Sequence, residues 1–493
     1  MRSRCYFFIL VLICFVNQTI SAQQWQWASN YDFPGEEAGS VIGGQDSDGN
    51  LYVAVQVARG YVATDYYLLK VSPYGELIWS RNISQYFQAR IVTNKQGFNF
   101  LCWLDRLVGI DKDGNEIWVK KTDGQRIFGA VFLHENGFIA NGKEQVGDST
   151  KTFISAYDEN GDLLTNVTVN NHKASLMALD STENCYFVYP DYPDPVTGNS
   201  ARLQKYSKTG ILNLELVIPY EPTQIISDPH GNVFITGNYG YDPIEINGVK
   251  YTVPQGMLER HHFIIKYDSS GDVLWYKIIT GSLGRTSMCL DKNGNLYYSI
   301  GFSNEINIIG DLHLKDELGN LLVIKFDPDG ELLWHHLASS PSSEILNYAS
   351  PEQCLVNENN EVFISGWIVG AVNFGAVQVH GHSNMYSELF IGKIDQNNLA
   401  GLKDQKIPSG FDFLIYPNPS TGGRFQVYFN PAQSFSVNIS VSNVQGQKIF
   451  ESNAVAAPGM VTIEIDASKF PTGVYLLEIV GAKGRAVRKI VRD

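Results

Sequence analysis

The chain has 493 residues, and 37 Lys and Arg face 51 Asp and Glu, which gives a formal net charge of −14. Residues 23–410 hold 27 basic and 45 acidic residues, so this part alone carries −18 and would repel a phosphate backbone. Nucleic acid is therefore excluded as an expected partner. Abundant Gly, Tyr and Phe, without long helical periodicity, favour strands and tight turns.

The first 22 residues have the pattern of a secretory signal peptide. Two arginines precede an apolar stretch that ends at Val16, and the small residue Ala22 closes the segment. The apolar stretch is shorter than the roughly 20 residues that span a membrane. A lipid anchor is not expected, because Cys14 follows Ile13 where such signals carry Gly, Ala or Ser. We therefore expect an exported protein that does not span a membrane.

A two-part unit recurs through residues 23–404. Its first half is a strand, an Asp/Asn-Gly-Asn turn and a strand, as in residues 288–297; its second half is a strand, an Asp-x-x-Gly turn and a strand with Leu-Trp, as in residues 264–275. First-half turns fall at Gly49, Gly97, Gly137, near Asn184, at Gly231, Gly294 and near Asn360, and second-half turns at Gly75, Gly114, Gly161, Gly210, Gly271, Gly330 and near Asn397. Seven units of four antiparallel strands predict an all-β fold, a seven-bladed β-propeller.

The two ends of this repeat region complement each other. The seventh unit ends at residues 398–402 without a tryptophan strand, and residues 25–30 supply one at the mature N-terminus. We expect that strand to complete the last blade and to leave no open interface in the ring. Residues 25–404 resemble secreted bacterial propellers of the SBBP and PQQ-like repeat families, a resemblance that implies the fold and leaves the function open.

Four cysteines remain in the mature chain: Cys102, Cys185, Cys289 and Cys354. Each stands alone in an apolar run, without the Cys-x-x-Cys spacing of zinc or redox sites. Buried free thiols are the expected state. Cys289 and Cys354 occupy matching places in adjacent repeats, so a disulfide between them is the alternative.

The pattern changes at about residue 411, after a linker at residues 405–410. Alternating apolar residues and Gly-centred turns in residues 411–493 predict a small β-sandwich. Its motifs, in their order at the chain end, resemble the type A sorting domain of the type IX secretion system. That resemblance implies a Bacteroidetes-type host, recognition at the outer membrane by the type IX machinery, and attachment to the cell surface or release. The residues that carry it are Tyr416, Pro417, Asn418, Pro419, Gly446, Pro471, Gly473, Tyr475 and Lys489.

Acidic turns raise the question of calcium. Asp46, Asp48 and Asn50 place oxygens at alternate positions, but Leu51 follows where an EF-hand-type loop needs glycine. A hairpin turn with a positive-φ glycine is the preferred interpretation. The adjacent pairs His261-His262 and His335-His336 point to opposite faces of a strand; His380 and His382 could share a face, but no third ligand is apparent. We predict no metal and no cofactor.

Enzyme signatures are equally weak. Sialidase-type turns place Trp three residues after Gly, whereas here the spacing is four, as from Gly75 to Trp79. Quinoprotein dehydrogenases share that spacing but often hold the quinone with adjacent cysteines, and the chain has no such pair. Trp79 and its equivalents are therefore expected to pack between blades. No residue is assigned a catalytic role.

Long loops distinguish the fifth to seventh units. Residues 238–260, 302–320 and 367–388 extend the connection between the second and third strands, and we expect them to form a wall on one face of the ring. Aromatic residues there suit sugars or peptides, while Asp242, Glu245 and Glu259 favour hydroxyl-rich or cationic ligands. Alternatively, the aromatics only pin the loops. The candidate ligand face comprises Tyr239, Tyr241, Tyr251 and Trp367.

These observations favour an exported, non-enzymatic propeller that binds polysaccharide or protein at the cell surface or outside the cell. A secreted enzyme, such as a lyase, hydrolase or quinoprotein, is the alternative, and a structural surface component is the third. Titratable groups near the middle of the ring would favour the enzyme, and an aromatic rim would favour binding.

Overall fold

The computed structural model describes residues 25–492 except 32, 34–35, 60–61, 87, 123–125, 135–136, 170–175, 195–197, 220–221, 240–243, 247–248, 252–260, 318, 342–346, 376, 382–386, 395–413, 417–419, 421, 430–434, 444–446, 457–460 and 482–483. The chain divides into two compact units, one ending at residue 396 and one formed by the C-terminal residues. The expected signal peptide and the linker at 405–410 lie outside the described residues. No helix in the described part is long and apolar enough to cross a membrane.

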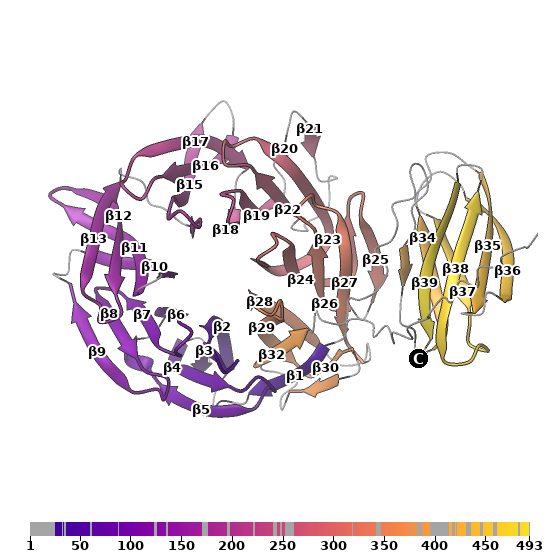
Figure 1. The fold of residues 1–493 in the computed structure, drawn as a ribbon, viewed down its shortest axis with the longest axis horizontal. Helices are drawn as coiled ribbons and strands as arrows, with labels where there is room; N and C mark the ends of the chain where they lie inside the picture. Colours follow the sequence, from indigo (N-terminus) through magenta and orange to yellow (C-terminus); the bar gives the residue numbers. More distant parts are fainter. Residues whose placement is uncertain are drawn as a thin grey trace, which may run out of the picture. The chain divides into compact units, whose positions relative to one another are not determined.

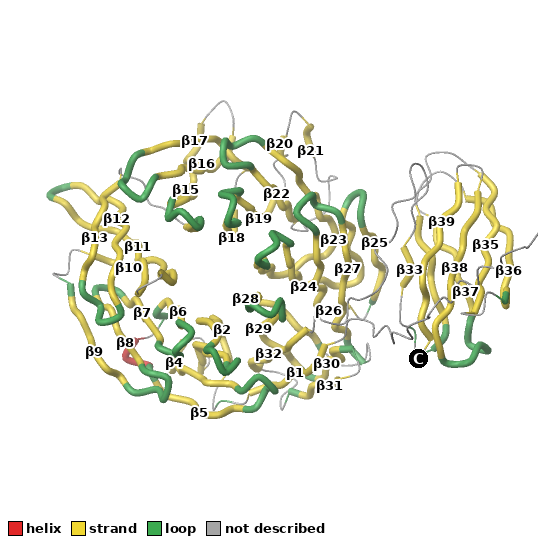
Figure 2. The backbone as a smooth tube through the Cα atoms, in the orientation of Figure 1, coloured by secondary structure: helices red, strands yellow, loops and turns green. Residues whose placement is uncertain are grey.

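The first unit is built from small antiparallel sheets in a ring (Figure 1). We number its blades from the N-terminus. Blades 1 to 4 are separate four-stranded sheets in chain order: β2 (Glu36–Gln45), β3 (Leu51–Arg59), β4 (Val62–Val71), β5 (Leu77–Asn82); β6 (Arg90–Thr93), β7 (Asn99–Trp103), β8 (Arg106–Ile110), β9 (Glu116–Lys121); β10 (Arg126–His134), β11 (Gly137–Val146), β12 (Ser149–Asp158), β13 (Leu163–Val169); β14 (Leu176–Leu179), β15 (Cys185–Asp194), β16 (Gly198–Tyr206), β17 (Leu212–Pro219). Figure 2 shows short loops between strands, and one short 3-10 helix, η1 (Ser84–Tyr86), in the described part.

The next two blades share one ten-stranded sheet. Its strands are β18 (Pro222–Ser227), β19 (Val233–Tyr239), β22 (His261–Tyr267), β23 (Val273–Leu290), β24 (Leu296–Ile308), β25 (Leu312–Asp316), β26 (Gly319–Phe326), β27 (Leu332–Ser339), β30 (Ala371–Phe374) and β31 (Val377–His380). The long strand β23 is the outer strand of blade 5 in its first half and the inner strand of blade 6 in its second half. This division is our interpretation, and the number of seven blades remains a prediction from the repeat.

Blade 7 contains the first strand of the described residues. Its sheet has the order β1 (Trp25–Tyr31), β32 (Glu388–Ile394), β29 (Val362–Val369), β28 (Tyr348–Val356). β1 is antiparallel to β32, with Trp25 opposite Ile394 and Tyr31 opposite Leu389. The N-terminal strand thus forms the outer edge of the last sheet.

The hydrophobic core of the ring lies between neighbouring blades. Leu69 of blade 1 packs in one cluster with Phe363 of blade 7, and Leu101 of blade 2 packs with Tyr52 of blade 1. The outer strands are much more exposed: in β5 no side chain is fully buried. Each sheet is therefore stabilised mainly by its neighbours in the ring, as in repeat architectures.

Tryptophans of the outer strands pack on the second-half turn of the next blade. A Cβ added to Gly330 would lie 2.8 Å from the Trp275 ring, and the Trp275 indole N–H donates to the Pro328 carbonyl at 3.0 Å. Gly330 has a φ of 83°, so its turn needs glycine for the backbone as well as for the ring. Trp27 of β1 donates in the same way to the Pro73 carbonyl at 2.8 Å. These contacts confirm the expected packing role.

The C-terminal unit has two antiparallel sheets around one core. One sheet contains β33 (Leu414–Tyr416), β34 (Arg424–Phe429) and β37 (Val461–Asp466), and the other β36 (Lys448–Ala456), β35 (Phe435–Asn443), β38 (Gly473–Gly481) and β39 (Gly484–Arg492). Phe425 of the first sheet and Ile439 and Leu477 of the second are fully buried in the same cluster. The repeat region is thus followed by a unit of a different β architecture.

Candidate functional site

The insertions of blades 5 to 7 are β-hairpins, and those of blades 6 and 7 pair with the outer strand of the preceding blade. In blade 6, Ile306 and Ile308 of β24 pair with Gly281 and Ile279 of β23. In blade 7, Phe374 of β30 pairs with Ala338 at the end of β27. In blade 5 the insertion includes β20 (Ile244–Ile246) and β21 (Val249–Tyr251), and Ile244 is buried with the core shared by blades 4 and 5. The insertions therefore fasten blades to one another.

The predicted ligand-face residues occupy different surroundings. Tyr239 is 6% exposed, with its ring 5.5 Å from that of His261, and the Tyr251 hydroxyl lies 2.7 Å from the hydroxyl of Tyr276. Trp367 is partly exposed near the end of β29. Tyr241, like Asp242 and Glu259, lies outside the described residues. Tyr239 and Tyr251 thus contribute to packing. Trp367 differs from them because it lies beside the exposed side chain of Arg285.

Two neighbouring positions of the inner strand can be compared across all seven repeats. At each of them, a single blade carries a charged residue. Six residues before the first-half turn, Arg285 is the charged residue of its set, which in blade order is Ser40, Gln88, Phe128, Ala174, Pro222, Arg285 and Pro351. Five residues before the turn, Glu352 is the charged residue of the set Val41, Ala89, Gly129, Ser175, Thr223, Thr286 and Glu352. The tenth residue after the start of the turn is Gln56, Leu104, Glu144, Pro190, Asn238, Gly301 or Trp367. A repeat fold needs none of these exceptions, which marks Arg285, Glu352 and Trp367 as a candidate site.

β-Bulges bring the two charged side chains together. The ladder of β23 shifts between Leu283 and Thr286, and that of β28 shifts between Pro351 and Gln353, so Arg285 and Glu352 both lie at bulges. A bulge bends its strand and redirects a side chain. The Arg285 Nη1 lies 2.5 Å from the Glu352 Oε1 and donates a hydrogen bond across the boundary of blades 6 and 7.

Blade 1 completes the environment of the carboxylate. The Ser40 amide of β2 donates to the Glu352 Oε2, and the Ser40 hydroxyl lies 3.4 Å from the same oxygen. A Cβ on the neighbouring Gly39 would lie 3.3 Å from that oxygen, so glycine leaves the room that Glu352 needs. The side chain of Glu352 is 8% exposed and that of Arg285 58% exposed. Three blades therefore meet at a buried carboxylate with an exposed guanidinium.

Burial dominates the protonation of Glu352. Desolvation raises its pKa, and the Ser40 amide and the Arg285 charge, which favour the ionised form, offset this only in part. Both carboxylate oxygens already accept hydrogen bonds. Glu352 is thus arranged as a fixed counter-charge for Arg285.

The Trp367 ring lies beside the guanidinium and packs on a second aromatic ring. The Arg285 guanidinium carbon lies 5.8 Å from the centroid of the Trp367 ring, within cation–π range. Tyr348, at the start of β28, meets Trp367 edge to face with centroids 5.0 Å apart. The indole is thus contacted by Arg285 of blade 6 and by Tyr348 of blade 7.

A disulfide lies close to this cluster. Cys289 of β23 is bonded to Cys354 of β28, with the two Cα atoms 5.5 Å apart. The amide of Cys354 also donates to the Ser287 hydroxyl at 2.9 Å. Our expectation of free thiols holds for the buried Cys102 and Cys185 and is wrong for this pair, whose matching places on adjacent inner strands were the signal for the alternative.

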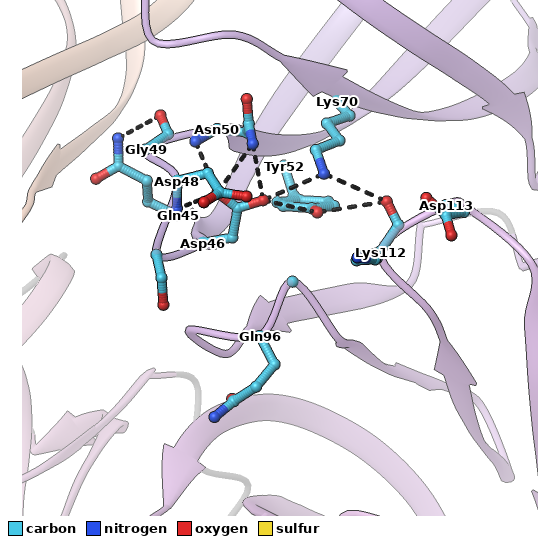
Figure 3. Close-up of polar contacts among 12 residues, drawn as sticks. Gln45, Asp46, Asp48, Gly49, Asn50, Tyr52, Lys70, Gln96, Lys112 and Asp113 are labelled. Carbon is cyan, nitrogen blue, oxygen red and sulfur yellow. Dashed lines mark hydrogen bonds and ion pairs between the residues drawn. The ribbon is translucent and has the colours of Figure 1, made fainter.

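The acidic turns are hydrogen-bonded internally. Figure 3 shows the Asp46 carboxylate surrounded by donors: its Oδ1 accepts from the amides of Asp48 and Asn50, and its Oδ2 accepts from the Tyr52 hydroxyl at 3.1 Å. Lys70 adds an ion pair at 3.2 Å. Burial would raise the pKa of Asp46, but the donors of Asn50 and Lys70 outweigh it and hold that pKa below its usual range. Among the described residues, no group of three or more His, Cys, Asp or Glu side chains is arranged to hold a metal.

The same turn recurs in other blades with small changes. Asp291 of blade 6 accepts from Asn295 and Tyr297, and Lys325 lies 3.5 Å from its carboxylate. In blade 4, Asp180 accepts from Asn184 and the Tyr186 hydroxyl. Because it is common to both halves of the ring, this network serves the fold.

A shallow pocket of about 570 Å³ lies where β1 passes the second-half turn of blade 1 and β31. Several of its polar groups are engaged by the protein itself. The Asn30 side-chain amide donates to the His380 carbonyl at 3.0 Å and to the Glu388 carboxylate at 2.9 Å, and the Tyr31 hydroxyl donates to the Gly75 carbonyl at 2.8 Å. These bonds fasten the N-terminal strand, so the pocket belongs to ring closure. His382 lies outside the described residues.

The predicted sorting motif is partly described. Tyr416 ends β33, Gly473 and Tyr475 lie on β38, and Lys489 of β39 is opposite Leu476. The Tyr475 hydroxyl donates to the Pro471 carbonyl at 2.5 Å, and Tyr475 belongs to the core of the unit. Pro417, Asn418, Pro419 and Gly446 lie outside the described residues. The described motif residues therefore combine packing with positions on the last two strands.

Several solved structures are similar to the chain at low identity. A protein of unknown function from Bacteroides caccae is 10% identical, covers 62% of this chain and 94% of its own, and has a TM-score of 0.36. The Pan2 WD40 domain of Neurospora crassa is 9% identical, covers 75% and 95%, and has a TM-score of 0.44. A quinonprotein alcohol dehydrogenase-like protein from Bacteroides thetaiotaomicron is 11% identical, covers 60% and 66%, and has a TM-score of 0.35.

The sequence comparisons concern the C-terminal unit. No curated protein matches the chain. Residues 414–493 match the model of a secretion system C-terminal sorting domain, which indicates export. The match begins at β33 and includes every strand of the C-terminal unit. The ring of antiparallel sheets makes the chain an all-β protein of the propeller type, and its residues 414–493 are similar to a secretion system C-terminal sorting domain.

Proposed function

We propose that this chain is an exported binding protein, delivered to the cell surface or the medium by type IX secretion, whose propeller binds a ligand on the inner strands of blades 6, 7 and 1. The sorting-domain match supports the export, and its type IX assignment rests on the motif from Tyr416 to Lys489. The arrangement that supports the ligand site best is the exposed Arg285, fixed by the buried Glu352 beside Trp367.

Binding accounts for this arrangement better than catalysis does. A general acid or base must offer its carboxylate to a substrate. Both oxygens of Glu352 instead accept hydrogen bonds from Ser40 and Arg285. The raised pKa of Glu352 is the observation that favours an enzyme, and desolvation by its neighbours is a sufficient cause. A lyase, hydrolase or quinoprotein therefore stays the second candidate.

The binding role is tested by asking what the mature protein, residues 23–493, does to polysaccharides. We expect sedimentation with an insoluble polysaccharide, or retardation in a gel that contains a soluble one, while the length of the polysaccharide stays unchanged. Shortened chains in size-exclusion chromatography, or new unsaturated ends absorbing in the ultraviolet, would establish an enzyme instead.

Export by the C-terminal unit is tested by removing residues 411–493. Because the two units have separate cores, the repeat region should fold and be retained in the periplasm. Fractionation of the host, with the full chain as control, measures this. Surface display of the truncated chain at the level of the full chain would contradict the sorting role.

A further inference from the structure

We propose that the ligand is a neutral, hydroxyl-rich polysaccharide, with Arg285 donating hydrogen bonds to its oxygens and Trp367 stacking on a sugar ring. This inference rests on the proposed binding function and specifies its ligand. It is carried by Arg285, Glu352, Trp367 and Tyr348 and by the covalent link beside them.

Arg285 can donate more hydrogen bonds than the one it makes to Glu352. A guanidinium carries five N–H groups in a rigid plane. The Nη1 donates to Glu352, while 58% of the side chain is exposed. The ion pair fixes the plane, so the remaining N–H groups can meet ligand oxygens with little further loss of side-chain freedom. Sugar hydroxyls and ring oxygens accept such bonds.

The charges around Arg285 disfavour an acidic ligand. Glu352 lies 2.5 Å from the guanidinium and offsets its charge, and the repeat region with its linker, residues 23–410, carries 45 acidic against 27 basic side chains as a whole. The attraction of an acidic ligand to Arg285 and its repulsion by Glu352 act over similar distances, so the repulsion would offset much of the attraction. A neutral ligand avoids that repulsion and still accepts the hydrogen bonds.

Trp367 supplies the apolar half of the site. It is the partly exposed side chain of β29, a strand whose other residues are all buried. Tyr348 supports the indole edge to face, and Arg285 lies within cation–π range. A rigid aromatic ring gives contact area to the C–H face of a sugar at small entropic cost. An exposed arginine beside a tryptophan is also the composition of energetically dominant contacts in interfaces.

The site is assembled before a ligand arrives. The Cys289–Cys354 disulfide joins the two inner strands that carry Arg285 and Glu352. Gln353 accepts a hydrogen bond from the Ile42 amide at 2.7 Å, which connects β28 to blade 1. Blades 6, 7 and 1 are thus fixed to one another around the cluster, and preorganisation lowers the cost of binding.

Native electrophoresis through gels that contain one polysaccharide each tests the inference. The mature protein is run in mannan, xylan and β-glucan as neutral probes, and in polygalacturonate and alginate as acidic probes. We expect retardation by at least one neutral probe and by neither acidic one. Arg285→Ala and Trp367→Ala should each weaken that binding by at least tenfold, and Arg285→Lys by less.

The matched control uses a second arginine–tryptophan contact. Arg106 lies 5.5 Å from the Trp103 ring in blade 2, so Arg106→Ala removes a similar side chain away from the site and should leave binding unchanged. Circular dichroism and the melting temperature establish that each variant is folded. Retardation by the acidic probes alone, or neutral binding that both site variants retain, would overturn the inference and leave the binding function standing. Retardation by none of the probes would overturn the inference, and shortened probe chains would overturn the binding function with it.

Discussion

Blades 1 to 4 and blades 5 to 7 are built from the same unit, yet they are connected differently. In blades 1 to 4 each sheet ends at its fourth strand, and the outer strands β5, β9, β13 and β17 are largely exposed. In blades 5 and 6 the outer strands pair with the hairpin of the next blade. The disulfide and the Arg285–Glu352 ion pair are on the same side of the ring.

The comparison shows where added chain length is used in a repeat protein. Short loops are sufficient for the ring, because the core between neighbouring sheets stabilises it. The longer insertions add strand pairs that connect blades 5 to 7. The exceptional residues occur on the same side of the ring, Arg285 and Glu352 on inner strands and Trp367 on β29. These added connections and the asymmetry of the side chains together favour this side for recognition.

The largest effect is expected from removing the strand that closes the ring. Deletion of residues 23–30 exposes the backbone of β32 and removes Trp25, which is 3% exposed and packs edge to face on Phe374. A buried Trp alone is worth about 3–5 kcal/mol, so the melting temperature should fall by more than 10 °C or the cooperative transition should disappear. Trp118→Ala in blade 2 is the control and should cost less, because Trp118 is only partly buried. Equal melting temperatures of the deletion and the mature chain would contradict ring closure by β1.

Removal of the disulfide should have the next largest effect. Changing Cys289 and Cys354 to Ala should lower the free energy of unfolding by about 2–4 kcal/mol, because the bond closes a loop across 65 residues. Urea denaturation measures this, with Cys102→Ala of blade 2 as the control. Thiol titration of the denatured mature chain should find two free thiols before reduction and four after it. Four free thiols without reduction would show that the bond does not form.

Much of this architecture follows from the sequence. The turns are marked by Gly49, Gly75 and their equivalents, and the incomplete seventh unit together with Trp25 indicates how the ends meet. The role of the insertions could not be derived from the sequence. Ile306 and Phe374 pair with strands of another blade, and nothing in the sequence around them indicates which strand that is.

The site was only partly accessible to sequence reasoning. Trp367 was selected for its loop, while Arg285 and Glu352 were missed because bulges decide that they meet. A comparison of equivalent repeat positions would have found both, since each is the charged member of its set.

The acidic turns should contribute equally to stability in blades 1 to 4 and in blades 5 to 7. Asp46→Ala in blade 1 and Asp291→Ala in blade 6 each leave a buried lysine without its carboxylate, and we expect a similar loss of about 2 kcal/mol in both. Thermal denaturation measures it. Calcium and a chelator should leave the melting temperature of the mature chain unchanged. A calcium-dependent increase would establish a cation site in these turns.

The smallest effect expected is a dependence of stability on pH, caused by two histidines of blade 6. Burial lowers the pKa of His335 to about 4 and that of His336 to about 3, below the ordinary value of 6.5. Between pH 6.5 and 4 the unfolded chain therefore binds protons that the folded chain does not, and stability falls as pH decreases. Taken in full, the two shifts would amount to about 5 kcal/mol. Both side chains are only partly buried, so water screens the effect and we expect a loss on the order of 1–2 kcal/mol, measured as urea midpoints at pH 7 and pH 4.5. Changing both residues to Gln should flatten the profile; an unchanged profile would contradict the assignment, and His380→Gln, at an exposed position, is the control.

Hydrogen exchange of the mature protein, with and without the polysaccharide that retards it, tests the location of the site most directly. We predict slower exchange in residues 282–290, 348–356 and 362–369, which carry Arg285, Glu352 and Trp367. The inner strands β6, β10 and β14 of blades 2 to 4 should exchange equally fast in both states. Protection confined to blades 2 to 4 would contradict the account.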